Sequence, residues 1–361
     1  MIILWCINWV FSTCLNEVIF ENENENSIYL LVTGFGKETD SIIDFINTYP
    51  SFKETKIKFN VEVLDHDNSA SFTAKDWNRI ANKINSNYDS YNAFVVLHGF
   101  STVEFTTSYL SYHFGLHEKT IVVTTSQVLP SETYSDFVSN VFGALKLANA
   151  EPKVPEVLFY ADNTIHRGTR FIGLESASIS AFSSPNFPTL GTVGHDVALD
   201  KSKILNGNTQ APEISDAKDR VSMIFFYPGM QLSVVKALLD SSEGAVLLAF
   251  GMGNGPSTDK PLLNLLKEVT DAGKVVVDCT QCYNGRVDFS VYATGEVMHD
   301  AGCIGGCDLT PAAAFTKLTY LLNKKAKDPS IDVKKMMGEP IVGELTKLQE
   351  ADLQVMRFRR N

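Results

Sequence analysis

The chain has 361 residues, of which 44% are hydrophobic and 20% are charged, and its formal net charge is −11. This composition excludes a disordered chain, and the length favours two packed domains. The acidic balance leaves no basic stripe for a nucleic-acid backbone, so nucleic acid is not an expected partner. The closing basic run, Arg357-Phe358-Arg359-Arg360, is expected to cap a helix or to lie in solvent.

The first 14 residues resemble a secretory signal. They are mostly apolar but too short to span a bilayer, and Ser12 and Cys14 supply small residues at the spacing that signal peptidase prefers. The sequence therefore favours a signal peptide over residues 1–14 and a secreted protein. Because no basic residue precedes the apolar run, an unprocessed extension of a cytoplasmic protein is the alternative. Residues 15–26, which end in an alternating Glu-Asn run, are expected to form a polar linker.

Short apolar runs alternate with helical patterns from Ser27 onward. Such runs are typical of strands buried on both faces of a parallel sheet, with the intervening helices covering those faces. Thr73 and Asp76 have the spacing of a helix capping box, and Gly115 is expected to end a helix. The expected strands are Ile28–Thr33, Lys58–Leu64, Ala93–Leu97, Thr120–Thr124 and Val157–Tyr160, and the expected helices are Ser41–Thr48, Thr73–Tyr88, Thr102–Phe114 and Glu132–Ala148.

A polar stretch from Asp196 to Asp219 interrupts this alternation, and a second alternation begins at Arg220. The predicted organisation is an N-terminal domain over residues 27–200, a linker over 201–219 and a C-terminal domain over 220–361. The second half is expected to contain the strands Met223–Phe226, Ala245–Phe250 and Lys274–Cys279 and the helices Gln231–Leu239, Pro261–Ala272 and Pro311–Leu322.

Four of the six cysteines lie beyond the leader, and four thiolates would suit a tetrahedral zinc ion. The surrounding residues are apolar or glycine-rich, as at strand ends and turns, so we expect small buried hydrophobes in place of metal ligands. The sequence predicts no metal site and no cofactor. These cysteines are Cys279, Cys282, Cys303 and Cys307.

Nine motifs in a fixed order connect the chain to one family. It resembles the L-asparaginases of the short bacterial type, and most closely the cytosolic type I enzymes. The resemblance implies an α/β fold with a larger N-terminal doubly wound, mainly parallel domain and a smaller C-terminal domain, assembled as a homodimer or homotetramer. The motifs are Thr33-Gly34 after an apolar strand, His98-Gly99-x-x-Thr102, Ser126-Gln127-x-x-Pro130 with Ser135-Asp136, Arg167-Gly168-x-Arg170, Ser184-Pro185-Asn186, Tyr227-Pro228-Gly229, Gly251-x-Gly253-Asn254, Thr280-Gln281-Cys282 and Gly305-Gly306-x-Asp308.

The same resemblance predicts that the catalytic side chains are missing. Amide hydrolysis through a covalent intermediate needs a hydroxyl nucleophile, a proton acceptor and groups that stabilise the oxyanion. The family's nucleophilic Thr corresponds to Gly36, and its relay Lys corresponds to Gly173. Its second catalytic Thr and its substrate-binding Asp correspond to Phe100 and Ser101. The segment after the first strand is also shorter than in the family and lacks the lid loop.

Parts of a ligand pocket are expected to survive. Ser69 matches the serine that binds the substrate's α-carboxylate, and Thr33, Thr102 and Ser126 keep their hydroxyl groups, although each could be an ordinary turn or cap residue. We expect a structural role for His98. In type I relatives Thr and Cys of the Thr-Gln-Cys motif contribute to an allosteric site. Thr280 and Cys282 match them, but Leu248 replaces the arginine of that site.

Three hypotheses follow. The first is a pseudoenzyme that binds a protein partner or an amino acid such as asparagine or aspartate without hydrolysing it. The second is a working L-asparaginase or related amidohydrolase, converting asparagine and water to aspartate and ammonia, with a relocated nucleophile at Ser101 or Thr102. The third is a regulatory subunit of an intact paralogue.

Overall fold

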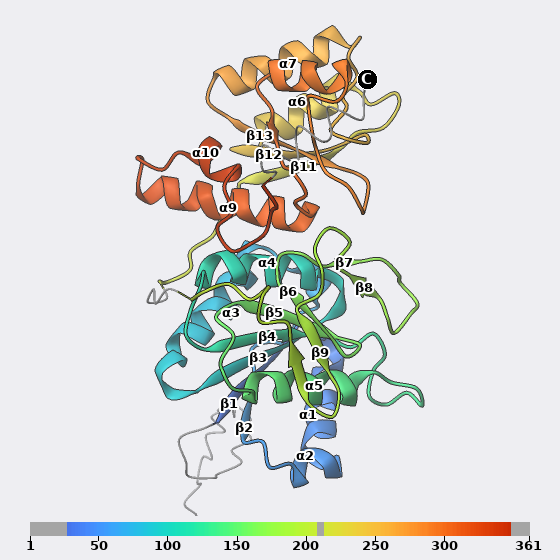
Figure 1. The fold of residues 1–361 in the computed structure, drawn as a ribbon, viewed down its shortest axis with the longest axis vertical. Coiled ribbons are helices and arrows are strands. Elements are labelled where there is room, and N and C mark those ends of the chain that lie inside the picture. Colours follow the sequence, from blue (N-terminus) through green and yellow to red (C-terminus); the bar gives the residue numbers. More distant parts are fainter. Residues whose placement is uncertain (1–26, 208–212, 348–361) are drawn as a thin grey trace, which may run out of the picture.

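The protein, described from a computed structural model, contains two α/β domains stacked along the long axis (Figure 1). The structure describes residues 27–207 and 213–347. Within them the larger domain contains an eight-stranded sheet in the order β10-β9-β6-β5-β4-β3-β1-β2. Its strands are β1 (Ile28–Thr33), β2 (Phe59–Val63), β3 (Ala93–His98), β4 (Thr120–Thr124), β5 (Val157–Ala161), β6 (Thr164–Arg167), β9 (Gly191–Val193) and β10 (Val197–Leu199).

The five strands β1 to β5 run parallel and are covered on both faces. Every residue of β1, β3, β4 and β5 is buried, which explains why their sequences are continuous apolar runs. One face packs against α1, α2 and α5, and the other packs against α3 and α4. The helices are α1 (Thr39–Thr48), α2 (Pro50–Glu54), α3 (Ala74–Ser86), α4 (Val103–Phe114) and α5 (Phe137–Asn149).

Helix boundaries follow local signals where the sequence supplies them. Thr73 and Asp76 form the predicted capping box of α3, and Gly115, with φ of 59°, ends α4. The predicted start of α5 at Glu132 is wrong. The helix begins at Phe137, because Ser135 and Asp136 bond to the preceding loop through their side chains.

The antiparallel extension of the sheet was not predicted. Strand β6 pairs with β5, β9 pairs with β6, and β10 pairs with β9. The last of these lies inside the stretch from Asp196 to Asp219 that the sequence analysis treated as irregular, and that interpretation is wrong for Val197–Leu199. A three-residue edge strand carries too little periodicity to be recognised. A further two-stranded ribbon joins β7 (Ile172–Gly173) and β8 (Phe182–Ser183).

The smaller domain contains a parallel sheet in the order β11-β12-β13-β14. Its two faces pack against α6, α7 and α8 on one side and α9 and α10 on the other. The fold class predicted from sequence is confirmed. The elements are β11 (Val221–Phe225), α6 (Leu232–Asp240), β12 (Gly244–Ala249), α7 (Lys260–Asp271), β13 (Val275–Thr280), α8 (Ala293–Asp300), β14 (Ile304–Gly305), α9 (Pro311–Lys327) and α10 (Val333–Met337).

Helix α9 lies against α4 where the two domains meet (Figure 1). The buried Arg170 pairs with Asp308 across this boundary at 2.9 Å, and its Nε donates to the carbonyl of Gly343. Lys317 and Glu344, both fully buried, form a second ion pair at 2.5 Å. Paired in this way, buried charges are tolerated. The Arg170–Asp308 pair links the two domains, whereas Lys317 and Glu344 both belong to the smaller domain.

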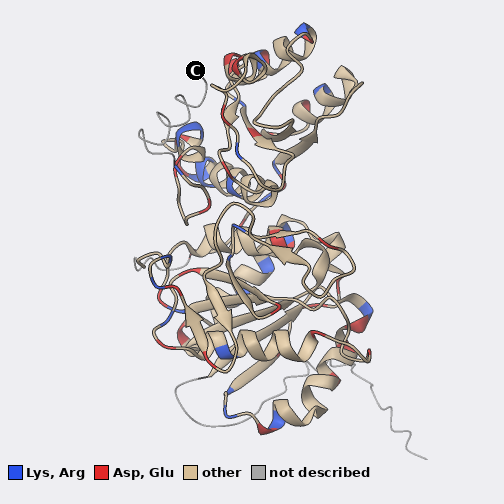
Figure 2. Cartoon of the chain, turned by 45° about the vertical axis from the view of Figure 1, so that its right-hand side comes forward, with Lys and Arg blue, Asp and Glu red and all other residues tan. Residues whose placement is uncertain are grey.

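Basic and acidic side chains are interspersed over both domains (Figure 2). In the part of the chain that the structure describes, no helix is both long and apolar enough to cross a membrane. The predicted signal peptide at 1–14 and polar linker at 15–26 lie outside the described residues.

Candidate active site

The polar strand ends of the larger domain meet in a compact cradle formed by Gly34, Ser69, Gly99 and Thr102. A Cβ atom on Gly34 would lie 2.9 Å from the Gly99 nitrogen, and one on Gly99 would lie 2.1 Å from the Gly34 oxygen. Only glycine permits this approach, so both positions are glycine because the two backbone segments pack directly against each other. The amide of Ser69 donates to the Gly34 carbonyl at 2.9 Å, and the Thr102 hydroxyl donates to the Ser69 carbonyl at 2.7 Å. The chain thus brings together β1, β3 and the segment before α3.

Position 36 has no reactive group. Gly36 is buried, has φ of 60°, and donates its amide to the Asp67 carbonyl at 3.0 Å. This left-handed conformation costs a threonine free energy that glycine does not lose. The backbone itself therefore disfavours a β-branched nucleophile here.

Aromatic packing surrounds Phe100, which the resemblance aligns with the family's second catalytic threonine. The ring of Phe100 lies 5.1 Å from the ring of Phe182, which also packs against Phe159 and Phe171. Ser101 is exposed and makes no side-chain hydrogen bond within the described part of the chain. Neither residue supplies a carboxylate for an ammonium group.

Gly173 faces a carboxylate that the sequence analysis did not identify. Its amide donates to the side chain of Glu104, in the first turn of α4, and a Cβ on Gly173 would lie 2.9 Å from the Glu104 carboxyl oxygen. Burial raises the pKa of Glu104. An acid thus lies where the family's relay lysine is expected. Its only sequence signal was an acidic residue in a first helical turn, which usually indicates a cap.

The remaining hydroxyl groups are engaged in local bonds. Thr33 is fully buried and donates to the Asp65 carboxylate at 3.2 Å. Ser126 donates to the Val128 carbonyl at 2.5 Å and bonds to Asp136 at 2.8 Å. These contacts order turns, which is the ordinary role of such residues. Of the four residues predicted to bind ligand, the cradle unites Ser69 and Thr102, while the hydroxyls of Thr33 and Ser126 are directed to other groups.

His98 is buried in a structural environment. One ring nitrogen lies 2.6 Å from the Gly99 carbonyl and the other lies 2.9 Å from the Thr106 hydroxyl. Burial lowers the pKa of His98 to about 4. With both nitrogens engaged and no access to solvent, this imidazole orders the end of β3, as the sequence analysis expected.

Thr280 and Cys282 lie at the end of β13 in the smaller domain. The Thr280 hydroxyl donates to the Gly251 carbonyl at 2.5 Å and accepts from the Cys282 amide at 3.0 Å. Cys282 is exposed, contrary to the expectation of a buried thiol, because the chain has left the sheet at this point. Leu248 is buried in the apolar face that packs against α9, so this position offers no charge to an effector.

All four cysteines in the described part of the chain are free. Over residues 27–207 and 213–347, no three His, Cys, Asp or Glu side chains are grouped so that they could hold a metal ion.

The two-domain α/β fold carries the motifs Thr33-Gly34 and His98-Gly99 at the carboxyl ends of two parallel strands. This arrangement defines a protein of the asparaginase class. Comparison with known families agrees. The model for the N-terminal domain of asparaginase matches residues 34–205, and the model for the C-terminal domain of glutaminase and asparaginase matches residues 220–337.

The chain is 36% identical to L-asparaginase 1 of Escherichia coli K12 over 280 residues, which cover 77% of this chain and 82% of that protein. It is 34% identical to an L-asparaginase of Dirofilaria immitis over 320 residues, but this match spans 84% of the chain and only 54% of that relative. A crystal structure of L-asparaginase I from Vibrio cholerae superposes with a TM-score of 0.80 at 33% identity, covering 90% of this chain and 100% of that chain. The protein belongs to the asparaginase family.

Proposed function

We propose that the chain is a non-hydrolysing member of the asparaginase family, a scaffold that binds a protein partner or a small amino acid. The observation that carries this proposal is the joint replacement of four reacting positions by Gly36, Phe100, Ser101 and Gly173. Losing one member of a catalytic unit can lower turnover by about 10⁶, roughly 8 kcal/mol of transition-state stabilisation. With all four groups replaced, amide hydrolysis by the family's covalent mechanism is not expected.

The side chains around these positions support the proposal. A substrate ammonium would meet the neutral side chain of Ser101 where the family has an aspartate, next to the aromatic pair of Phe100 and Phe182. The relay position faces the carboxyl group of Glu104. Ser69 keeps a hydroxyl group that can donate to a bound carboxylate, while the Thr102 hydroxyl donates to the Ser69 carbonyl and holds this turn in place. Among the described residues, neither group is paired with a base that would activate a nucleophile.

Ammonia release separates this proposal from its competitors. Purified chain mixed with asparagine is expected to release no ammonia above the buffer blank, and calorimetric titration with asparagine and aspartate reports whether the cradle binds either one. An active amidohydrolase with a relocated nucleophile would instead release ammonia and lose this activity on Ser101→Ala or Thr102→Ala substitution. Thr102 already donates its proton to the Ser69 carbonyl, which makes it a poor nucleophile.

The assembly and location of the protein are part of the same proposal. We infer two domains, at residues 27–200 and 220–361, joined by a linker at 201–219, in a homodimer or homotetramer. Residues 1–14 are proposed to direct secretion, with a cytoplasmic protein as the alternative. A regulatory subunit would instead co-purify with an intact paralogue from its native source, and sedimentation of the purified chain alone tests the homo-oligomer.

A further inference from the structure

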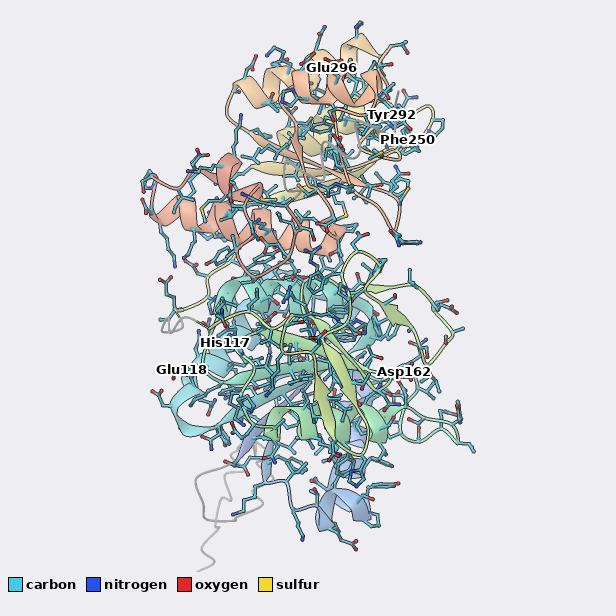
Figure 3. All side chains as sticks on the ribbon, in the orientation of Figure 1. His117, Glu118, Asp162, Phe250, Tyr292 and Glu296 are labelled. Carbon is cyan, nitrogen blue, oxygen red and sulfur yellow. The ribbon has the colours of Figure 1, made fainter. Side chains whose placement is uncertain are left out.

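A second polar cavity lies beside the degenerate site. It has a volume of about 250 Å³ and lies between the β5–β6 turn and the end of β8. Asp162, which is labelled in Figure 3, lies at this turn and is exposed. Phe182 lines the cavity and also contacts Phe100, so one aromatic ring separates the two sites. The residues that matter for its chemistry are Ala161, Asp162, His166, Phe182, Ser183 and Ser184.

His166 and Ser184 form a hydrogen-bonded pair in the wall of this cavity. The Nδ1 atom of His166 lies 2.7 Å from the Oγ atom of Ser184. His166 belongs to β6 and is only 3% exposed, while Ser184, directly after β8, is partly exposed. The distance is that of a nucleophile and its general base.

The imidazole of His166 is positioned by packing. Its ring lies 6.0 Å from that of Phe159 and 6.2 Å from that of Phe171. Burial lowers the pKa of His166 to about 4, so the ring is neutral at pH 7 with a free lone pair, but it is a weak base. The tautomer with its proton on Nε2 leaves Nδ1 free to accept the Ser184 proton.

We propose that Ser184 and His166 are a nucleophile and general base that hydrolyse small neutral esters through an acyl-enzyme. The Ser184 oxygen attacks the ester carbonyl carbon while its proton passes to His166 Nδ1. The carbon–oxygen bond to the alcohol then breaks, and the alcohol leaves with that proton. Water then attacks the acyl carbon while one of its protons passes to His166 Nδ1. The bond between the acyl carbon and Ser184 Oγ breaks, the carboxylic acid leaves, and Oγ takes that proton back.

The walls define the class of acyl group. A cavity of about 250 Å³ bounded by Ala161 and Phe182 accommodates a short chain, such as acetyl or propionyl. The Asp162 carboxylate, which accepts a hydrogen bond from Ser180, repels an anionic acyl group. Within the described residues the His166 ring makes no second hydrogen bond, so no carboxylate stabilises the imidazolium, and turnover is expected to be slow.

This inference uses none of the four replaced positions and goes beyond the proposed function. Its test is labelling of the full chain with diisopropyl fluorophosphate, followed by peptide mass spectrometry, together with hydrolysis of p-nitrophenyl acetate. A phosphoryl adduct on Ser184 and at least a tenfold loss of ester hydrolysis in Ser184→Ala and His166→Gln are expected. Ser139→Ala is the matched control, because Ser139 is an exposed serine of α5 that bonds to the Asp136 carbonyl and does not line this cavity, and it should keep the parent rate.

An adduct on another residue, or ester hydrolysis that survives Ser184→Ala, would overturn the assignment. The location of the adduct in the unsubstituted chain is decisive even if a variant fails to fold. Ammonia release from asparagine, recorded on the same preparations, reports separately on the proposed function.

Discussion

The buried ion pairs and the region around the cradle at the ends of β1 and β3 differ in how completely their polar groups are used. Arg170 meets Asp308 across the two domains, and Lys317 meets Glu344 in full burial within the smaller domain. Beside the cradle, Gly36, Phe100 and Ser101 occupy the positions that the family resemblance assigns to a nucleophile, a second threonine and a carboxylate. Under the proposal of a non-hydrolysing scaffold, the paired charges stabilise the fold and the replaced positions carry no reaction.

The largest effect is expected from breaking the fully buried ion pair. Lys317→Ala leaves the Glu344 carboxylate buried without its ammonium partner, and should lower the free energy of unfolding by about 3–5 kcal/mol. Urea denaturation measures this change. In the control, Lys317→Met combined with Glu344→Gln removes both charges while the Gln oxygen still accepts from the amides of Ile341 and Val342, so most of the loss should be recovered. If the single and double variants lose the same amount of unfolding free energy, the unpaired charge of Glu344 is not the cause of the destabilisation.

Asp278 tests the opposite case, a buried acid with no partner. Both of its carboxyl oxygens lack a hydrogen bond in the described structure, and burial raises the pKa of Asp278 to about 8. Because the folded protein holds a proton that the unfolded chain has released, the stabilisation is complete below about pH 4 and is lost as pH rises toward 8. The free energy of unfolding should fall by about 1.4 kcal/mol per pH unit between roughly pH 5 and 7.5.

The Asp278→Asn variant removes this titration. Its free energy of unfolding, subtracted from that of the parent chain at each pH, isolates the Asp278 contribution, because Glu104 titrates in both proteins. The buried histidines, such as His98 with a pKa of about 4, stay neutral above pH 6.5. A difference that does not change with pH would mean that the carboxyl group is ionised or solvated in the folded state.

A smaller effect is expected at the nucleophile's position. Gly36→Thr places a β-branched side chain at φ of 60°, which should lower the free energy of unfolding by about 1–2 kcal/mol. It should release no ammonia from asparagine, since the neighbouring positions still lack the relay. Gly36→Ala is the matched control for strain without a hydroxyl group. Ammonia release by the threonine variant alone would show that a single missing group silences the site.

The smallest effect is expected at the surface. Lys267 and Asp271 pair at 3.0 Å on the exposed face of α7. Lys267→Ala should change the free energy of unfolding by less than about 0.5 kcal/mol, because solvent screens exposed ion pairs. A larger loss of unfolding free energy, measured by thermal denaturation, would contradict the claim that buried ion pairs stabilise the fold more than exposed ones.

The fold could be predicted from sequence where burial is complete. Apolar runs marked the strands beginning at Ile28 and Thr120, and the Thr73 capping box marked a helix start within one residue. The short strands Gly191–Val193 and Val197–Leu199 could not be found, because their stability comes from pairing with β6 and with each other rather than from a local pattern.

The site divides in the same way. Motif order located Gly34 and Gly99, and the family resemblance placed Ser69 with them. The four replaced positions stay predictions from that resemblance. The contacts of Glu104 with Gly173 and of His166 with Ser184 join residues 69 and 18 positions apart. No spacing rule in a single sequence connects such pairs, so only the folded structure brings them together.

The most direct test of the central claim is ammonia release from asparagine by the folded full chain, measured beside an L-asparaginase of the same family at equal concentration. Because the proposal holds that the nucleophile, the second threonine, the carboxylate and the lysine are all replaced, we expect a rate lower by a factor on the order of 10⁶ and indistinguishable from the blank. Release at a rate comparable with that of the reference enzyme would contradict the account.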